Sequence, residues 1–155
     1  MYSFYLSKNQ KTAGVFACAP ITKSVAKQTN FVLHLVGYNS EIIQDPNEIS
    51  INLFVEQKLV AKIIEGCNAI SIIILFSSFI VAFTGNFKNT FIFISIGSLI
   101  IYVTNILRIA IITIAIFEYP AYQKVLHDII FPSLIYGITF LLWFVWVKKF
   151  SKVNK

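Results

Sequence analysis

Residues 90–117, TFIFISIGSLIIYVTNILRIAIITIAIF, form a long apolar run that decides the class of the protein. A helix needs about 20 mostly apolar residues to cross a bilayer. This run has 28 residues and one charge, Arg108. The whole chain of 155 residues is 57% hydrophobic and 13% charged, with a mean hydropathy of +0.74. Because a small soluble domain needs more polar surface than this, the sequence predicts an integral membrane protein.

Two further apolar runs flank this one. Together the three predict an all-α membrane protein, a polytopic helical bundle with spans at about 68–84, 90–117 and 129–147. Trp143 and Trp146 close the third run and are expected at the membrane interface.

The region before the first run is more polar. Residues 20–36 predict an amphipathic helix suited to a membrane surface, with Pro20 in its first turn and Gly37 as its stop. Residues 39–47 predict a polar loop, and the alternation over 49–64 predicts a short extracytoplasmic β-hairpin.

We interpret residues 1–155 as one membrane domain. It comprises an extracytoplasmic N-terminal region (1–66), a three-span core (67–147) and a basic tail (148–155). The tail has four lysines and no acid, which places it in the cytoplasm and residues 1–66 outside. An exported region needs a signal and none follows Met1, so we expect that a preceding span is missing from this chain.

Three chemically active residues are expected at similar depth on three helices. Cys67 stands at the outer start of the first span, where a helix N-terminus favours a thiolate, and His127 stands at the outer start of the third. Arg108 lies 18 residues beyond Thr90, or about 27 Å up the second span. A thiolate nucleophile, a histidine that moves protons and a fixed cation suit acyl transfer from an amide.

Three further residues are candidates for supporting roles. Asn105 shares a helix face with Arg108, and either Asp128 or Glu65 is a candidate to orient His127.

Plainer readings stay open for each residue. A cysteine at a span boundary is usually packing, and an arginine near a span end often reaches the interface. The competing hypothesis is therefore a non-catalytic membrane assembly or anchoring subunit. Cys18 and His34, the latter expected on the apolar side of its helix, are interpreted as structural. The sequence predicts no metal site and no cofactor, the lipid bilayer as a partner, and no nucleic acid.

Several segments resemble the exosortase/archaeosortase family, most of all its small exosortase F branch. They are Glu65–Ile70 (EGCNAI), Asn105–Ile109 (NILRI), His127, residues 20–29 (PITKSVAKQT) and residues 131–137 (FPSLIYG). Many members have a small residue and then glycine after the cysteine, where this chain has Asn68 and Ala69.

The resemblance implies a multi-pass bacterial inner-membrane cysteine peptidase or transpeptidase. Its substrates would be exported proteins that end in a sorting signal: a short motif, a membrane helix and a basic tail. By match, Cys67 would be the nucleophile, with Arg108 and His127 as the other two catalytic residues, facing the periplasm.

Overall fold

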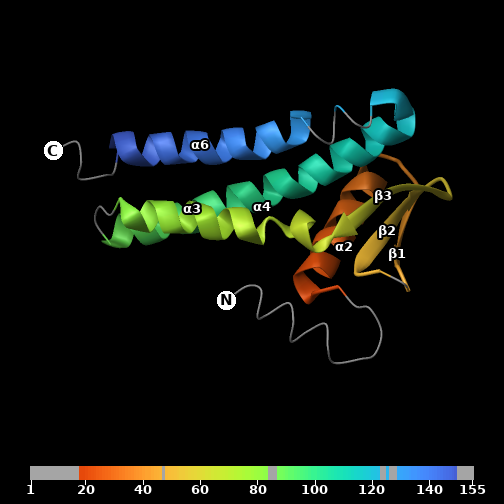
Figure 1. The fold of residues 1–155 in the computed structure, drawn as a ribbon, viewed down its shortest axis with the longest axis horizontal. Helices are drawn as coiled ribbons and strands as arrows, with labels where there is room; N and C mark the ends of the chain where they lie inside the picture. Colours follow the sequence, from red (N-terminus) through yellow and green to blue (C-terminus); the bar gives the residue numbers. More distant parts are fainter. Residues whose placement is uncertain (1–17, 47, 84–86, 123–124, 126–128, 150–155) are drawn as a thin grey trace. The chain divides into compact units, whose positions relative to one another are not determined.

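The computed structural model describes residues 18–46, 48–83, 87–122, 125 and 129–149. Figure 1 shows its elements, where η marks a 3-10 helix: α2 (Pro20–Leu35), β1 (Ser40–Gln44), β2 (Ser50–Val55), β3 (Lys58–Ile64), η1 (Glu65–Asn68), α3 (Ile70–Ala82), α4 (Phe87–Glu118), η2 (Pro120–Tyr122) and α6 (Phe131–Lys149).

The described residues form two compact units. One contains the residues up to Asn68 and those from Ile106 to Tyr122; the other contains Ala69–Asn105 and the described residues from Val125 onward. Helix α4 contributes to both.

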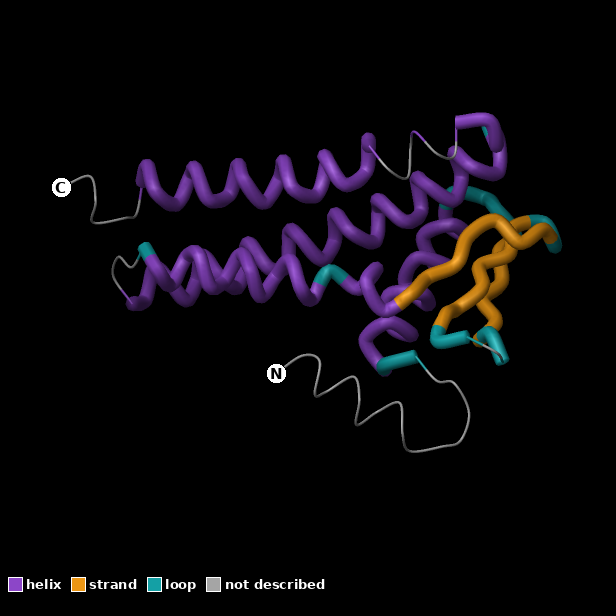
Figure 2. The backbone as a smooth tube through the Cα atoms, in the orientation of Figure 1, coloured by secondary structure: helices purple, strands orange, loops and turns teal. Residues whose placement is uncertain are grey.

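The predicted all-α class is wrong, because the first unit contains a three-stranded antiparallel sheet in the order β1-β2-β3 (Figure 2). The predicted hairpin is confirmed as β2 and β3. Strand β1 was missed because it lies within the segment expected to be a polar loop. Its own pattern is weak, and pairing with β2 from Ser40↔Val55 to Gln44↔Ile51 makes it a strand.

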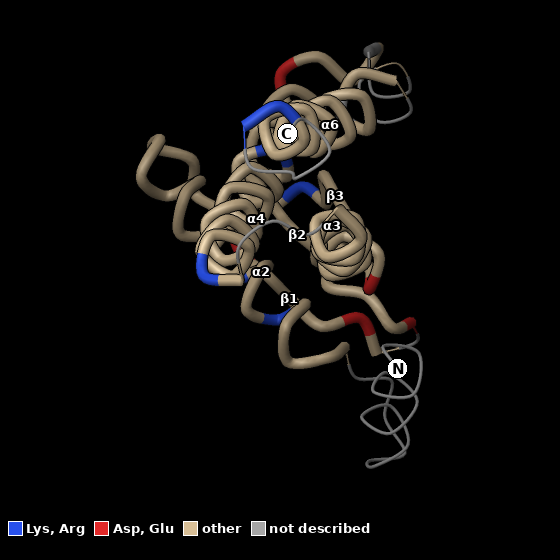
Figure 3. Tube along the Cα trace, turned by 90° about the vertical axis from the view of Figure 1, so that its left-hand side faces the viewer, with Lys and Arg blue, Asp and Glu red and all other residues tan. Residues whose placement is uncertain are grey.

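The prediction of three spans is also wrong. Within the described ranges, α4 is the one helix that is long and apolar enough to cross a membrane, judged by length and composition. Helix α3 has 13 residues, which gives about 20 Å against a hydrocarbon core of about 30 Å. Helix α6 has 19 residues, of which the last two are Lys148 and Lys149, so its apolar part is shorter than the whole helix. Figure 3 shows the lysines and arginine in blue and the acids in red, and both are sparse along the trace.

In the first unit, α2 packs against the sheet. The predicted helix over 20–36 is confirmed, with Pro20 at its start, and Gly37 follows its end with a φ of +96°. The buried residues of α2 recur at helical spacing, and the central strand β2 buries alternate side chains. Each element therefore has one buried face, as expected where a helix packs on a sheet. The helix contributes Thr22, Val25, Ala26, Thr29 and Leu33, and β2 contributes Ile51, Leu53 and Val55.

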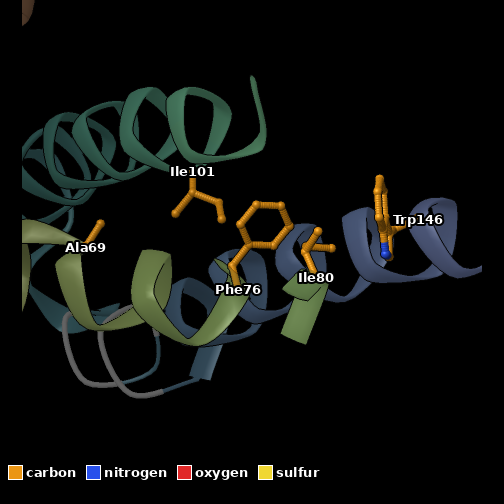
Figure 4. Packing of buried hydrophobic residues seen from close by; sticks show 5 residues of the cluster. All are labelled: Ala69, Phe76, Ile80, Ile101 and Trp146. Carbon is orange, nitrogen blue, oxygen red and sulfur yellow. The ribbon is translucent and has the colours of Figure 1, made fainter. Parts of the chain in front are cut away.

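In the second unit, an apolar core joins α3, α4 and α6. Figure 4 shows five of its members: Ala69, Phe76, Ile80, Ile101 and Trp146. Trp146, expected at a membrane interface, is instead fully buried, and its indole N–H donates to the carbonyl of Phe83 at 3.0 Å. Gly97 of α4 lets the Phe76 ring approach its backbone closely.

Candidate functional site

Cys67 lies in η1, the short turn between β3 and α3. Its side chain is half-buried, and η1 packs against α2. The expectation that Cys67 begins an α-helix is wrong, since α3 begins three residues later at Ile70. The position of the thiol therefore depends on the η1 turn and its contacts, and not on the N-terminus of α3.

Glu65 fixes one side of this turn. One carboxylate oxygen accepts a hydrogen bond from the backbone N–H of Ala19 at 2.6 Å, and the other accepts one from the hydroxyl of Thr22 at 2.8 Å. Ala19 is the N-cap of α2 and has no side chain able to cap it. Glu65 therefore supplies the acceptor that a capping box takes from within its own helix, and it places a negative charge at the positive end of α2.

Asn68 fixes the other side. This side chain is 1% exposed, and its amide donates to the same Thr22 hydroxyl oxygen at 3.3 Å. Residues before and after Cys67 are thus both bonded to one threonine of α2.

Ala69, which follows, has a φ of +61° and a ψ of −1°. This left-handed conformation is uncommon for a residue with a Cβ and costs about 1 kcal/mol or more. It turns the chain sharply from η1 into α3. The first two residues of the predicted span, Asn68 and Ala69, are consequently part of the turn.

Arg108 lies on α4, inside the apolar sequence that suggested its role. The residue is half-buried, and its Nε is buried without a hydrogen bond to any atom of the described residues. Arg108 and Cys67 belong to the same compact unit. Asn105, one turn earlier on the same helix face, is 1% exposed.

His127 and Asp128 lie outside the described residues. The common depth of Cys67, Arg108 and His127 therefore stays a prediction, as does the pairing of His127 with Asp128 or Glu65.

A family model described as transmembrane exosortase matches residues 12–145, most of the chain. The chain belongs to the transmembrane exosortase family. No curated protein and no solved structure matches it. All three candidate catalytic residues of this exosortase fall within the matched range.

The positive φ of Ala69 is a conformation that glycine adopts more readily than alanine. Glycine adopts a φ near +60° without the steric cost that a Cβ brings. Ala69 therefore adopts this left-handed conformation despite the steric cost of its Cβ.

Two other residues of this exosortase were interpreted as structural. Cys18 is 4% exposed, and the amide of Gln44 lies 3.7 Å from its sulfur. Burial raises the pKa of the Cys18 thiol, and the carboxylate of Glu65 adds to this rise, against the opposing effects of Gln44 and Lys23. His34 is exposed rather than on an apolar side, and its Nε2–H donates to the carbonyl of Ser40 at 2.9 Å.

Thr22 was not singled out from the sequence. It lies in the segment 20–29 that resembles the family, but nothing in that segment marks this threonine, whose bonds reach 43 and 46 residues along the chain. The positions of Cys67 and of the neighbouring Glu65 were the available signals, and neither identifies a distant partner. Within the described residues, no group of three or more His, Cys, Asp and Glu side chains could hold a metal ion.

Proposed function

We propose that this exosortase is a membrane cysteine peptidase or transpeptidase that cleaves the C-terminal sorting signal of exported proteins through a thioester on Cys67. The observation that carries the proposal is the turn around Cys67. It holds a half-buried cysteine by bonds on both sides, in the same compact unit as an arginine with a buried Nε that makes no bond to the described residues.

The chemistry divides among three residues. His127 takes the proton of the Cys67 thiol, and the resulting thiolate attacks the carbonyl carbon of the scissile amide. Arg108, which stays charged, stabilises the oxyanion of the tetrahedral intermediate. When the intermediate collapses, His127 returns the proton to the leaving amine and the substrate is left as a thioester. Water then gives hydrolysis, or an acceptor amine gives transfer.

Helix α4 supports the orientation that we propose for this site in the bilayer. Its 32 residues extend about 48 Å, more than enough to cross the hydrocarbon core. Lys88 lies in its first turn and Glu118 ends it. The positive-inside tendency places the Lys88 end toward the cytoplasm and the Glu118 end outside. We accordingly place the enzyme in the bacterial inner membrane, with Cys67 facing the periplasm and the lysine-rich tail in the cytoplasm.

Family membership, together with this orientation, supports the substrate class that we propose. A C-terminal motif, a membrane helix and a basic tail would anchor the substrate in the same bilayer. Its scissile bond would then lie just outside the membrane, at the level of Cys67.

The test measures release of a tagged C-terminal tail from such a substrate, in cells that produce each variant. Cys67→Ala should abolish release of the tail, while Cys18→Ala, which removes the other cysteine, should retain it. Arg108→Gln, which keeps hydrogen bonding but loses the charge, should slow release about 10²-fold or more. Continued processing by Cys67→Ala would reject the proposal and favour an anchoring subunit.

A further inference from the structure

The strongest unassigned feature is the buried hydroxyl of Thr22. The residue is 0% exposed and lies in the first turn of α2. Its hydroxyl donates to Glu65 at 2.8 Å and accepts from Asn68 at 3.3 Å. One oxygen atom therefore joins the residue two before Cys67 to the residue directly after it.

Capping of α2 does not require this hydroxyl. The bond from the N–H of Ala19, the N-cap residue, to Glu65 at 2.6 Å does not involve Thr22. Valine has nearly the shape of threonine, so a buried position with only a packing role would accept it. A buried hydroxyl is instead costly unless it is bonded. What the Thr22 hydroxyl adds is a bridge across the cysteine turn.

A second threonine on the same helix provides the comparison. Thr29 lies seven residues later, on the same buried face, and is also 0% exposed. Its hydroxyl oxygen makes no hydrogen bond within the described part of the chain. Thr22 and Thr29 thus match in burial and in the helix face on which they lie. They differ because only the Thr22 hydroxyl bonds to both Glu65 and Asn68.

We propose that Thr22 is a positioning residue of the enzyme, holding the Glu65–Asn68 turn so that the Cys67 sulfur meets the scissile carbonyl. This inference deepens the proposed function. Without the hydroxyl, Glu65 keeps its bond to Ala19, while Asn68 loses its bond to α2. The turn then has one bond fewer to α2 on the C-terminal side of Cys67. A displacement of about 1 Å at a nucleophile can lower a rate about 10²-fold.

The experiment compares Thr22→Val, Thr22→Ser and Thr29→Val in the full chain in membranes. Thr22→Val should lower kcat for tail release about 10²-fold with little change in KM, because substrate binding does not involve the turn's bond to α2. Thr22→Ser restores the hydroxyl and should recover most of kcat. Thr29→Val should match the parent protein.

A second measurement needs no substrate. In a Cys18→Ala background, alkylation by iodoacetamide reports Cys67 alone. Thr22→Val should speed this reaction several-fold, since the loosened turn exposes the thiol more, while Thr29→Val should leave it unchanged. Faster alkylation of Cys67 together with a lower kcat distinguishes a loss of positioning from general unfolding of the protein.

Equal kcat and equal alkylation in Thr22→Val and Thr29→Val would overturn the inference. So would a Thr22→Val protein that is less stable but has parental kcat per folded molecule. If Cys67→Ala still releases the tail, the proposed function fails, while the alkylation comparison still decides whether Thr22 holds the turn.

Discussion

Replacing Gly97 by alanine tests the packing of the second unit most sharply. A Cβ built at Gly97 would overlap Cζ of Phe76 and lie 2.6 Å from its Cε1. Ordinary contact requires about 1 Å more. The Phe76 ring is 0% exposed and has Phe93 beside it, with ring centroids 6.2 Å apart, so it has little room to move. Overpacking of this kind costs about 1–3 kcal/mol.

Helix propensity acts in the opposite direction. Alanine stabilises a helix interior by about 1 kcal/mol relative to glycine. Gly137 on α6 isolates this effect, because a Cβ there meets nothing within 4 Å. Gly137→Ala should therefore raise stability by up to about 1 kcal/mol. Gly97→Ala should be about 1–3 kcal/mol less stable than Gly137→Ala, the difference being the clash.

Thermal unfolding of the full chain in detergent, followed by circular dichroism, measures the difference. At about 2–4 °C per kcal/mol for a chain of this size, Tm of Gly97→Ala should lie several degrees below that of Gly137→Ala. Phe76→Leu combined with Gly97→Ala should recover part of the loss, since the smaller side chain makes room. A Gly97→Ala protein as stable as Gly137→Ala would refute the close approach of Phe76 to α4.

Three further outcomes are expected. Gln57→Gly should stabilise the protein by about 1 kcal/mol in the same unfolding assay, because Gln57 has a φ of +64° in the two-residue hairpin turn; an unchanged Tm would count against that turn. Iodoacetamide at pH 8 should modify half-buried Cys67 well before Cys18, whose burial both shields the thiol and raises its pKa above the usual 9.0; mass spectrometry showing Cys18 modified first would contradict this. Loss of solvation, with the hydrogen bond to Glu118, raises the pKa of Tyr38. The stability linked to this raised pKa is fully present below the pKa of tyrosine in the unfolded chain, near 10, and is lost as the pH rises through the pKa of Tyr38 in the folded protein. Tyr38→Phe should therefore lessen the fall in Tm at alkaline pH.

Local signals in the sequence located several elements correctly. Proline at a helix start and glycine after its end bracketed α2, and alternation identified β2 and β3. These patterns work because they report on neighbouring residues alone. The 28-residue apolar run likewise lies within α4, whose continuity through Arg108 needs no distant contact.

The errors arose where distant contacts override local pattern. The run 68–84 looks continuous, yet Asn68 bonds to Thr22 and Ala69 turns left-handed, so α3 begins at Ile70 and is too short to cross. Strand β1 owes its conformation to pairing with β2. The apolar run also gave no sign that Trp146 would be buried against α3 and bonded to Phe83.

The candidate site shows the same division. Residue chemistry and family likeness pointed to Cys67 and Arg108, which the structure places in one compact unit. Glu65 was one of two candidates to orient His127, the other being Asp128, and its oxygens accept bonds from the start of α2. No local pattern could have shown this, because the bonds join residues more than 40 positions apart.

The central claim is that Cys67 forms the acyl-enzyme. The direct measurement is mass spectrometry of the purified enzyme after mixing with a substrate, with peptides around both cysteines analysed. We predict a substrate acyl group on the Cys67 peptide, released by neutral hydroxylamine as a thioester is, and none on the Cys18 peptide. Substrate processing with no adduct on Cys67, or with an adduct on another residue, would contradict it.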